Sequence, residues 1–545
     1  MSIPTSRTDA LRTLSRERFD VLVIGGGATG CGVARDAALR GLRVALVERD
    51  DLASGTSSRS SRLVHGGVRY LEQGQLGLVF ESSAERRRLL RLAPHLVRPL
   101  EFTWPVYEGA RVAGWKLAAG LTLYDLLALF RNVGRHRRLD AAGVIAREPA
   151  LRRDGLTGGA TYWDAATDDA RLTLATALDA AAADAVVVNH ADVTALLRER
   201  GAVAGARVSD RLTGQTVEVR ARIVVNATGP WSDRVRALEE GAGAARAAVR
   251  GSKGVHILVP RERLGNRGAV TLLAPQDGRV FFVLPAEGYA VVGTTDTDTA
   301  ASPEGVRASC ADVEYLLEAA NTFFPAARLG EGDVVSAWAG IRPLVAGETS
   351  STSVRASREH AITRGAGGVI SVTGGKLTTY RVMAAQVTDA VERALGRRAR
   401  RTPTAERPLP GGLEPDRDAL LAEVRRATGL EERIARRLAE AYGSEWRAVW
   451  ELCDRVAGGR TPLVPELPYL AGELRWGAER ELACTLADLL VRRTRVAFET
   501  RDHGRTVAAH AAEIVAPALG WSESDVAGEI RRYEAEVERM FGIDS

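Results

Sequence analysis

The segment that most constrains the fold of this chain is a glycine-rich turn between two apolar runs near the N-terminus. Residues 19–51 read FDVLVIGGGATGCGVARDAALRGLRVALVERDD, which predicts a strand, a glycine turn, a helix and a second strand. Gly25, Gly27 and Gly30 form a G-x-G-x-x-G motif, and Glu48 ends the second strand. In this context the glycines let the backbone approach a pyrophosphate at a helix N-terminus, and the carboxylate can bond a ribose. The segment therefore predicts a βαβ unit that binds a dinucleotide, rather than a plain tight turn.

Composition narrows the class of protein to a globular chain of several domains. The 545 residues are 45% hydrophobic and 26% charged, which excludes disordered, collagen-like and coiled-coil chains. A chain of this length is expected to divide into domains with large cores. The net charge of +5 is small for this length and does not imply a nucleic-acid partner. An anionic substrate or a lipid surface remains open.

Cysteine spacing and hydropathy bear on metals and membranes. Cys31, Cys310, Cys453 and Cys484 show no spacing typical of a disulfide framework or a metal site, so we expect no metal and four buried thiols in a reducing compartment. The N-terminus lacks an apolar signal core, and no uncharged run reaches the ~20 residues that a bilayer span needs. We therefore expect a cytoplasmic protein, either free or attached to a membrane at its periphery.

The basic residues are strongly skewed toward arginine. Of the 74 basic residues only Lys116, Lys253 and Lys376 are lysines. A coding bias that places arginine wherever a positive charge suffices explains this skew. The three lysines then mark positions where the broader guanidinium does not fit, or they are chance survivors.

A second stretch extends the dinucleotide-binding pattern. Residues 221–233 read ARIVVNATGPWSD, a buried strand that ends in Ala227, Thr228 and Gly229, and short alternating strands precede it. A βαβ unit, a β-meander and a strand ending in ATG follow one another in FAD proteins with two dinucleotide-binding motifs. For the ATG alone, an ordinary glycine between a strand and a loop is the alternative.

Hydroxyl groups are concentrated in residues 54–75, which read SGTSSRSSRLVHGGVRYLEQGQ. Serine and threonine side chains beside glycines can line a flavin without steric clash, and Arg69 offers several N–H donors to an oxyanion. A solvated polar loop with a capped helix is the alternative.

The rest of the chain predicts an inserted domain and a C-terminal domain. Mixed strand and helix patterns interrupt the FAD-binding segments, a charged Pro- and Gly-rich stretch predicts a linker, and helical periodicity follows it. The expected fold class is α/β: a Rossmann-like two-dinucleotide-binding FAD domain, an inserted α+β substrate domain and a C-terminal all-α domain. The predicted bounds are 19–90, 186–260 and 361–400 for the FAD-binding domain, 91–185 and 261–360 for the substrate-binding domain, 401–412 for the linker and 413–545 for the C-terminal domain.

Five motifs together resemble a known family. They are SGTSSRSSRLVHGGVRYLE, KGVHILVP, VVGTTDTD, AGIRPL and GGKLTTYR. In this order they resemble the FAD-dependent glycerol-3-phosphate dehydrogenases of the quinone-linked bacterial and mitochondrial type, over most of the first 400 residues. The resemblance implies oxidation of sn-glycerol 3-phosphate to dihydroxyacetone phosphate by hydride transfer to FAD, with electrons passed to membrane quinone. It also implies attachment at the inner face of the membrane, and we expect a homodimer.

The resemblance, matched position by position, places five residues at the substrate: Arg69, Tyr70, His256, Arg342 and Lys376. His256 is the candidate base, because an imidazole titrates near neutral pH; a structural histidine is the alternative. Arg342 and Arg358 suit a bidentate contact to the substrate phosphate. Beside Arg358, Glu359 and His360 depart from the family's commoner residues.

The same matching gives the residues expected at the cofactor, and it assigns roles to the lysines. An ammonium at Lys376 would stabilise negative charge on the reduced flavin or bond the reacting oxygen. Lys253 is expected to orient the loop near His256 or to raise the local potential. Thr378 and Thr379 are expected to cap the following helix and to contact the flavin, or only to cap it. The residues expected to bind FAD are Gly25, Gly27, Gly30, Glu48, Thr56, Ser57, Ser61, His65, Gly66, Val193, Gly229, Gly375, Lys376 and Thr378.

Residues 114–138 combine an apolar helix with a basic end. An apolar face with aromatic ends and a basic flank suits a membrane interface, where the family meets quinone. A core helix with a solvated basic end fits the pattern equally well. The apolar residues are Trp115, Leu117, Leu121, Tyr124, Leu127, Leu129 and Phe130, and the basic residues are Arg131, Arg135, Arg137 and Arg138.

Three other functions remain open at the level of sequence. A glycerol-3-phosphate oxidase that uses oxygen shares the motifs. An amino-acid oxidase shares the FAD fold but does not account for Arg69, Arg342 and Lys376 meeting at an anion. A flavin-binding protein without enzymatic activity is the third. Ala286 replaces an aromatic residue common in the family, which bears on the shape of the substrate cover, and His65 leaves open whether FAD is bound covalently.

Overall fold

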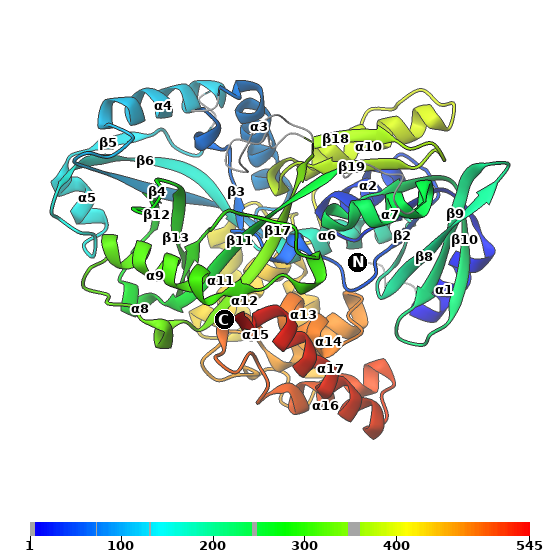
Figure 1. Cartoon of the computed structure of the whole chain (residues 1–545). Coiled ribbons are helices and arrows are strands. Elements are labelled where there is room, and N and C mark those ends of the chain that lie inside the picture. The colour runs from blue at the N-terminus through cyan, green and yellow to red at the C-terminus, as the bar shows by residue number, and fades with distance from the viewer. Residues whose placement is uncertain (1–5, 72–73, 130–131, 242–247, 347–359) are drawn as a thin grey trace.

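The computed structural model describes residues 6–71, 74–129, 132–241, 248–346 and 360–545, which form two large β-sheets and a helical C-terminal region (Figure 1). Phe130, Arg131 and Arg358 lie outside the described residues, as does the side chain of Arg69.

The first sheet contains the predicted βαβ unit. Its central strand β1 is buried along nearly its whole length and runs parallel to β2 on one side and β10 on the other. Helix α2 (Ala28–Leu39) packs against α6 (Asp169–Ala182) and α10 (Tyr380–Ala394). Burial on both faces explains why the strand is a continuous apolar run. The eight described strands are β1 (Arg18–Ile24), β2 (Val44–Val47), β7 (Val186–Val188), β8 (Ala191–Glu199), β9 (Ala202–Asp210), β10 (Thr216–Asn226), β18 (His360–Arg364) and β19 (Ile370–Gly374).

The second sheet is mostly antiparallel. Strand β11 lies between β14 and β17, and α9 (Cys310–Phe323) packs against one face of this part of the sheet. Helices α3 (Leu76–Leu92) and α4 (Gly114–Leu127) lie together at the opposite end of the view from the C-terminal helices (Figure 1). The ten described strands are β3 (Leu63–Val64), β4 (Val97–Tyr107), β5 (Arg137–Leu139), β6 (Leu156–Thr167), β11 (Val249–Pro260), β12 (Ala269–Leu273), β13 (Val280–Ala286), β14 (Tyr289–Gly293), β15 (Thr297–Thr299) and β17 (Ser336–Val345).

Three parts of the predicted domain division differ from the structure. Strand β11 belongs to the second sheet, although its sequence lies inside the predicted FAD-binding segment 186–260, because its ladder partners come from distant residues. Helix α6 packs on α2 beside the first sheet, although it lies inside the predicted substrate segment 91–185. The predicted linker is packed against the protein: Leu409 is buried, and Arg407 pairs with Asp179 of α6.

The C-terminal region is helical, as the sequence predicts, and shares a hydrophobic core with the second sheet. One continuous cluster joins Leu258 and Trp338 of this sheet to Leu490, Phe498 and Phe541 of the C-terminal region. The described helices are α11 (Arg417–Thr428), α12 (Glu432–Tyr442), α13 (Trp446–Asp454), α14 (Ala471–Arg480), α15 (Val496–Glu499), α16 (Ala508–Leu519) and α17 (Glu523–Phe541), with a π-helical turn at Asp488–Arg493.

Buried ion pairs join the C-terminal region to the first sheet. The fully buried carboxylate of Asp51, just after β2, accepts hydrogen bonds from Arg492 Nε and Arg493 Nη1, each at 2.6 Å. His190 Nε2 lies 2.9 Å from Asp488 Oδ2. The ligand atoms of Asp51, His190 and Asp488 lie within 4.8 Å of one another, as in some metal sites. Here Arg492 bridges the two carboxylates, so the arrangement is a protein ion-pair network.

Two expectations about burial and membranes can be compared with the structure. Cys31 and Cys453 are buried and Cys484 is half-buried, but Cys310 is exposed, so the expectation of four buried thiols was wrong. Cys310 is the first residue of α9 and lies outside the stripe that this helix packs onto the sheet. Among the described residues, no helix combines the length and the apolar character needed to cross a bilayer.

Candidate active site

The predicted glycine motif forms the turn between β1 and α2. Gly25 has a φ of 108°, which side-chain-bearing residues rarely adopt, and a Cβ on Gly30 would lie 1.9 Å from Gly25 O. The helix can therefore approach the turn only because both residues are glycines. Gly27 is the N-cap of α2, and the N–H of Ala28 donates to Ser57 Oγ at 3.0 Å. The helix N-terminus thus faces the hydroxyl-rich segment, in the arrangement that suits a bound phosphate.

Glu48 lies at the end of β2 beside this turn. Its carboxylate accepts hydrogen bonds from the N–H of Gly26 at 2.6 Å and of Asp50 at 2.9 Å. Burial raises the pKa of Glu48. Two backbone donors fix the orientation of the carboxylate, so its remaining lone pairs are directed for a ribose hydroxyl.

A cavity of about 330 Å³ begins at this turn and extends between the two sheets, a volume typical of ligand sites. Glycines at a helix N-terminus, an oriented carboxylate and a row of hydroxyls fit a flavin dinucleotide. Gly30 packs on the turn and does not line the cavity; Gly66 also does not, because it faces Tyr124 and Ser83. The sequence-predicted residues that do line it are Gly25, Gly27, Glu48, Thr56, Ser57, Ser61, His65, Tyr70, Val193, Gly229, His256, Arg342, Gly375, Lys376 and Thr378.

His256 lies on β11 at the end of the cavity away from the glycine turn. Its Nε2 is 2.8 Å from Ser61 Oγ, whereas Nδ1 is buried with no hydrogen-bond partner in the described part of the chain. Burial, together with the positive charges of Arg342 and Arg62, lowers the pKa of His256 to about 3. The imidazole is therefore neutral near pH 7 and is a weak base in the free protein. Gly293 on the neighbouring strand provides the space for the ring, because a Cβ there would lie 2.3 Å from His256 Cδ2.

Arg342 projects from the same face of the sheet as His256. In the β11–β17 ladder Ser252 is opposite Arg342 and His256 is opposite Trp338, and residues two apart on a strand share a face. The guanidinium bonds Thr294 Oγ1 at 2.8 Å and pairs with Asp296 at 3.3 Å. These contacts fix a planar group with several N–H donors at the wall of the cavity, which suits an oxyanion.

Lys376 follows β19, between the flavin-binding sheet and α3. Its Nζ lies 3.8 Å from the centroid of the Tyr70 ring and donates to Ser82 Oγ at 3.2 Å. The ring of His65 stacks on Tyr70, with 6.3 Å between centroids. Thr378 fixes the neighbouring backbone, since its Oγ1 accepts from His65 N and donates to His65 O. The ammonium thus reaches the cavity beside an aromatic ring.

Two sequence predictions near these residues require correction. Lys253 was expected to orient a loop near His256, but the segment is strand β11, and Lys253 lies on the face away from the cavity, where its Nζ donates to Asp312 Oδ2 at 2.6 Å. Three residues separate Lys253 from His256, and a strand directs residues at odd spacing to opposite faces. Neither Thr378 nor Thr379 caps α10 through its side chain; Thr379 Oγ1 bonds Lys376 O instead.

Some lining residues were missed by the sequence interpretation. Trp231, two residues after the ATG motif, packs beneath the guanidinium of Arg49 at 5.1 Å, and both donate hydrogen bonds to Glu304. The aromatic residue in ATGPW was a signal that could have been used. Glu304 lies in a short helix (Pro303–Gly305) that is far from Trp231 and Arg49 in the sequence, so no local pattern indicates its part in this contact.

Comparisons with known proteins agree with this geometry. The profile of a family described as FAD dependent oxidoreductase matches residues 20–381, and one described as the C-terminal domain of alpha-glycerophosphate oxidase matches residues 402–526. Glycerol-3-phosphate dehydrogenase 2 of Mycobacterium tuberculosis is 42% identical over 545 residues, which cover 98% of this chain and 91% of that protein. Mitochondrial glycerol-3-phosphate dehydrogenase of Homo sapiens is 38% identical over 543 residues, covering 95% and 73%.

A solved structure is similar over the whole chain. Glycerol-3-phosphate dehydrogenase from Bacillus halodurans in complex with FAD has a TM-score of 0.82 and 33% identity, covering 99% of this chain and 98% of that chain. These similarities confirm the predicted fold class, an FAD-binding α/β fold with a helical C-terminal domain. Because the matches include both the cofactor-binding region and the C-terminal helices, the chain belongs to the family of FAD-dependent glycerol-3-phosphate dehydrogenases.

Proposed function

We propose that this protein oxidises sn-glycerol 3-phosphate to dihydroxyacetone phosphate with FAD and passes the electrons to a membrane quinone. The observation that supports this most directly is the far end of the cavity, where a neutral imidazole, a fixed guanidinium and an ammonium lie on walls of one space. These groups suit the oxidation of a secondary alcohol that carries a phosphate, as a proton acceptor, a phosphate ligand and a source of positive charge. Bound FAD supplies the acceptor for the hydride that leaves the carbinol carbon.

His256 takes the proton of the substrate hydroxyl in this proposal. We assign the proton to Nε2, the ring nitrogen beside Ser61 Oγ, because Ser61 lines the cavity. The low pKa of the imidazole belongs to the free protein, in which Arg342 and Arg62 contribute positive charge. A bound phosphate dianion would offset this charge, so the basicity of the imidazole rises when substrate binds.

Arg342 orients the substrate phosphate, and Lys376 stabilises negative charge that develops at the reacting centre. A guanidinium held by Thr294 and Asp296 presents its donors in one plane without a further loss of side-chain freedom. Roles for Arg69 and Arg358 at the substrate stay predictions from sequence. Tyr70 is placed to position Lys376, because its ring lies under the ammonium.

The function is tested by adding sn-glycerol 3-phosphate to the FAD-loaded protein without oxygen. We expect the visible flavin absorbance to bleach, and glycerol without the phosphate to leave it unchanged at the same concentration, because glycerol offers Arg342 no phosphate to bind. Absence of bleaching with sn-glycerol 3-phosphate would contradict the proposal.

A second experiment identifies the electron acceptor. Oxygen or a soluble quinone is added to the reduced protein, and rapid reoxidation by quinone alone supports a quinone-linked dehydrogenase rather than an oxidase.

An exposed apolar patch supports attachment to a membrane. The patch comprises Leu76 and Phe80 of α3, Trp115 and Leu126 of α4, and Leu129 and Val133 after it, each 44–72% exposed. The opposite side of α4 is buried at Leu117, Leu121 and Tyr124, so the helix has both a core face and an exposed apolar face. Exposed Lys116, Arg135, Arg137 and Arg138 flank the patch. Such a surface suits the interface of an anionic bilayer.

The same helices lie next to residues of the cavity region, although no described residue of either helix lines the cavity itself. Ser82 of α3 accepts the hydrogen bond of Lys376, and Tyr124 of α4 packs against Gly66. A membrane bound at the patch would therefore lie near the site at which quinone must collect electrons. We accordingly place the protein at the inner face of the cytoplasmic membrane. The homodimer expected from sequence stays a prediction.

Replacing Phe80, Trp115 and Leu126 together by serine should release the protein from lipid. Each side chain contributes about 1.5–3 kcal/mol when fully buried, so we expect the partition coefficient onto anionic vesicles to fall by at least about tenfold. Co-sedimentation with the vesicles measures this. Leu413→Ser is the matched control, because Leu413 is the most exposed leucine of the described chain at 77% and belongs to the C-terminal region. Equal losses in both variants would exclude the patch as the binding surface.

A further inference from the structure

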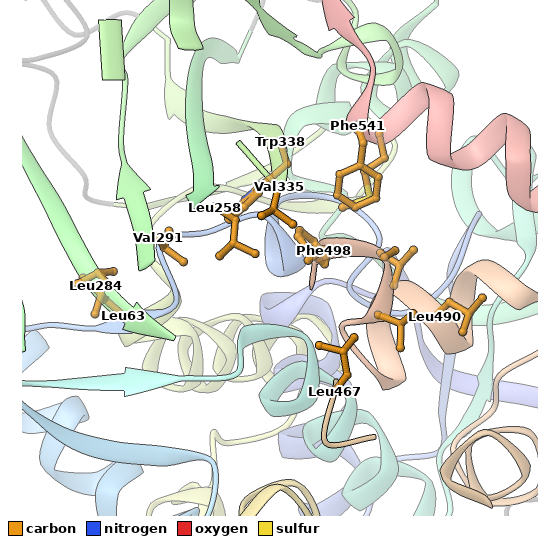
Figure 2. Packing of buried hydrophobic residues seen from close by; sticks show 14 of the residues in the cluster. Leu63, Leu258, Leu284, Val291, Val335, Trp338, Leu467, Leu490, Phe498 and Phe541 are labelled. Atoms are coloured by element: carbon orange, nitrogen blue, oxygen red, sulfur yellow. The ribbon is translucent and has the colours of Figure 1, made fainter. Parts of the chain in front are cut away.

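The wall behind His256 is built from aromatic residues of two different regions. Trp338 lies directly opposite His256 in the β11–β17 ladder, and their rings stack with 5.5 Å between centroids and 15° between planes. Phe498, from α15 of the C-terminal region, meets Trp338 with 5.1 Å between centroids and 90° between planes. Phe541 of α17 meets Phe498 at 5.0 Å and 87° (Figure 2). A continuous row of rings thus runs from the C-terminal helices to the imidazole.

Arg62 closes the corner between these rings. Its guanidinium carbon lies 5.2 Å from the centroid of Trp338 and 5.0 Å from that of Phe498. Two of its nitrogens, Nε and Nη2, are buried without a hydrogen-bond partner in the described chain. Burying this cation is costly; the two ring faces and the negative charges of Asp168, Asp169 and Glu499 offset part of that cost. The aromatic corner therefore helps to fix the side chain of Arg62.

The backbone next to Arg62 carries the other contact of the imidazole. Ser61, whose Oγ is 2.8 Å from His256 Nε2, directly precedes Arg62. Arg62 has a φ of 56°, a left-handed conformation that a non-glycine residue adopts only when its surroundings hold it there. Displacing Arg62 would thus move Ser61 as well. Trp338 and Ser61 contact the ring of His256, which lies in the space that Gly293 leaves open. The C-terminal region supports both contacts, because Phe498 packs against Trp338 and against Arg62, the neighbour of Ser61.

We propose that Trp338, Phe498 and Arg62 are positioning residues through which the C-terminal helical region holds His256 in the orientation that accepts the substrate proton. This rests on the proposed function, since it takes His256 as the proton acceptor. It gives the C-terminal region a part in the reaction, although none of the described residues that line the cavity comes from it. A row of fully buried rings is rigid enough to transmit such a constraint, because a packed core is not continuously deformable.

Phe498→Leu tests the proposal with a small loss of volume. Leucine keeps the site apolar but removes the ring that Trp338 and Arg62 contact. We expect the rate constant for flavin reduction to fall by about 10–100-fold, as for a misplacement of a catalytic group by about 1 Å. The apparent KM and the FAD content should change little, because Arg342 and the glycine turn are untouched. Phe281→Leu is the matched control: Phe281 is equally buried but lies in the core on the other face of the sheet.

A second readout does not depend on catalysis. Deuterium exchange at the imidazole C2–H of His256, followed by mass spectrometry of the FAD-loaded protein without substrate, reports the exposure and mobility of this ring. We expect faster exchange at His256 in Phe498→Leu and no change in Phe281→Leu. If the wild-type flavin is not reduced by sn-glycerol 3-phosphate but His256 exchange still responds to Phe498→Leu, the proposed function fails and the positioning role stands. If both variants match the wild type in both readouts, the positioning role is overturned.

Arg62 provides a test that leaves the aromatic rings themselves unchanged. Arg62→Met keeps much of the side-chain length but removes the cation, whereas Arg62→Lys keeps a cation that can face the two rings. We expect Arg62→Met to reproduce the Phe498→Leu result in both readouts and Arg62→Lys to restore at least part of the loss. Equal behaviour of the two Arg62 variants with wild-type exchange at His256 would contradict the proposal, even if Phe498→Leu failed to fold.

Discussion

Replacing His256 by glutamine is expected to slow reduction of the flavin by sn-glycerol 3-phosphate by about 10²–10⁴-fold, the usual contribution of a general base. Glutamine can still form a hydrogen bond with Ser61 Oγ, but it cannot accept the substrate proton. The fold and FAD content should be retained, because none of the glycine-turn contacts involves this side chain. Rapid mixing under anaerobic conditions measures the rate constant directly.

The pH dependence gives a second check on His256. Burial and the charges of Arg342 and Arg62 lower its pKa to about 3 in the free protein. The pH profile of kcat/KM reports groups of the free enzyme, so His256 should cause no loss on the acid side between about pH 5 and 9. An acid limb near pH 6.5 that disappears in His256→Gln would show that the pKa of His256 is not lowered.

His95→Gln is the control for histidine burial. The pKa of His95 is also lowered to about 3, by burial and by Arg171, and the side chain is buried to the same degree. It lies outside the cavity, next to Gly411 and Gly443. A loss of flavin reduction in His95→Gln as large as in His256→Gln would mean that the effect is structural.

The cofactor end of the site could be predicted from sequence because its determinants are local. A glycine turn between a buried strand and a helix places Gly25, Gly30 and Glu48 by short-range geometry alone, and the structure has them so placed. The reacting end of the site depends instead on contacts between distant parts of the sequence. His256 and Arg342 come from strands that are far apart in the sequence, and only their ladder register puts them on one face.

The errors have the same origin. Lys253 is close to His256 in the sequence and was expected to orient a loop there. The segment is a strand instead, and the odd spacing directs Lys253 to Asp312 on the other face. Of the three lysines, Lys376 alone reaches the cavity. The contacts of Phe498 with Trp338 and Arg62 join three distant segments, and no periodicity or motif in any one of them predicts this meeting.

The attachment of the C-terminal region can be tested at Asp51. Asp51→Asn removes the negative charge that pairs with the buried guanidinium groups of Arg492 and Arg493. Removing one partner of a buried ion pair leaves an uncompensated charge and typically costs about 3–5 kcal/mol. Arg492 keeps its contact with Asp488, which places the expected loss toward the lower end of this range.

We expect calorimetry of Asp51→Asn to show a transition of the C-terminal region at a lower temperature than the wild-type protein, and limited proteolysis to cleave near residues 401–412 sooner. Glu199→Gln is the matched control: Glu199 also pairs with two arginines, Arg18 and Arg220, but its side chain is 44% exposed. An exposed pair contributes about 0–1 kcal/mol because water and salt screen it. If Asp51→Asn and Glu199→Gln shift unfolding equally, the ion pairs of Asp51 do not hold the two regions together, and other contacts, such as the Arg171–Glu481 pair and the apolar core around Phe498, must do so.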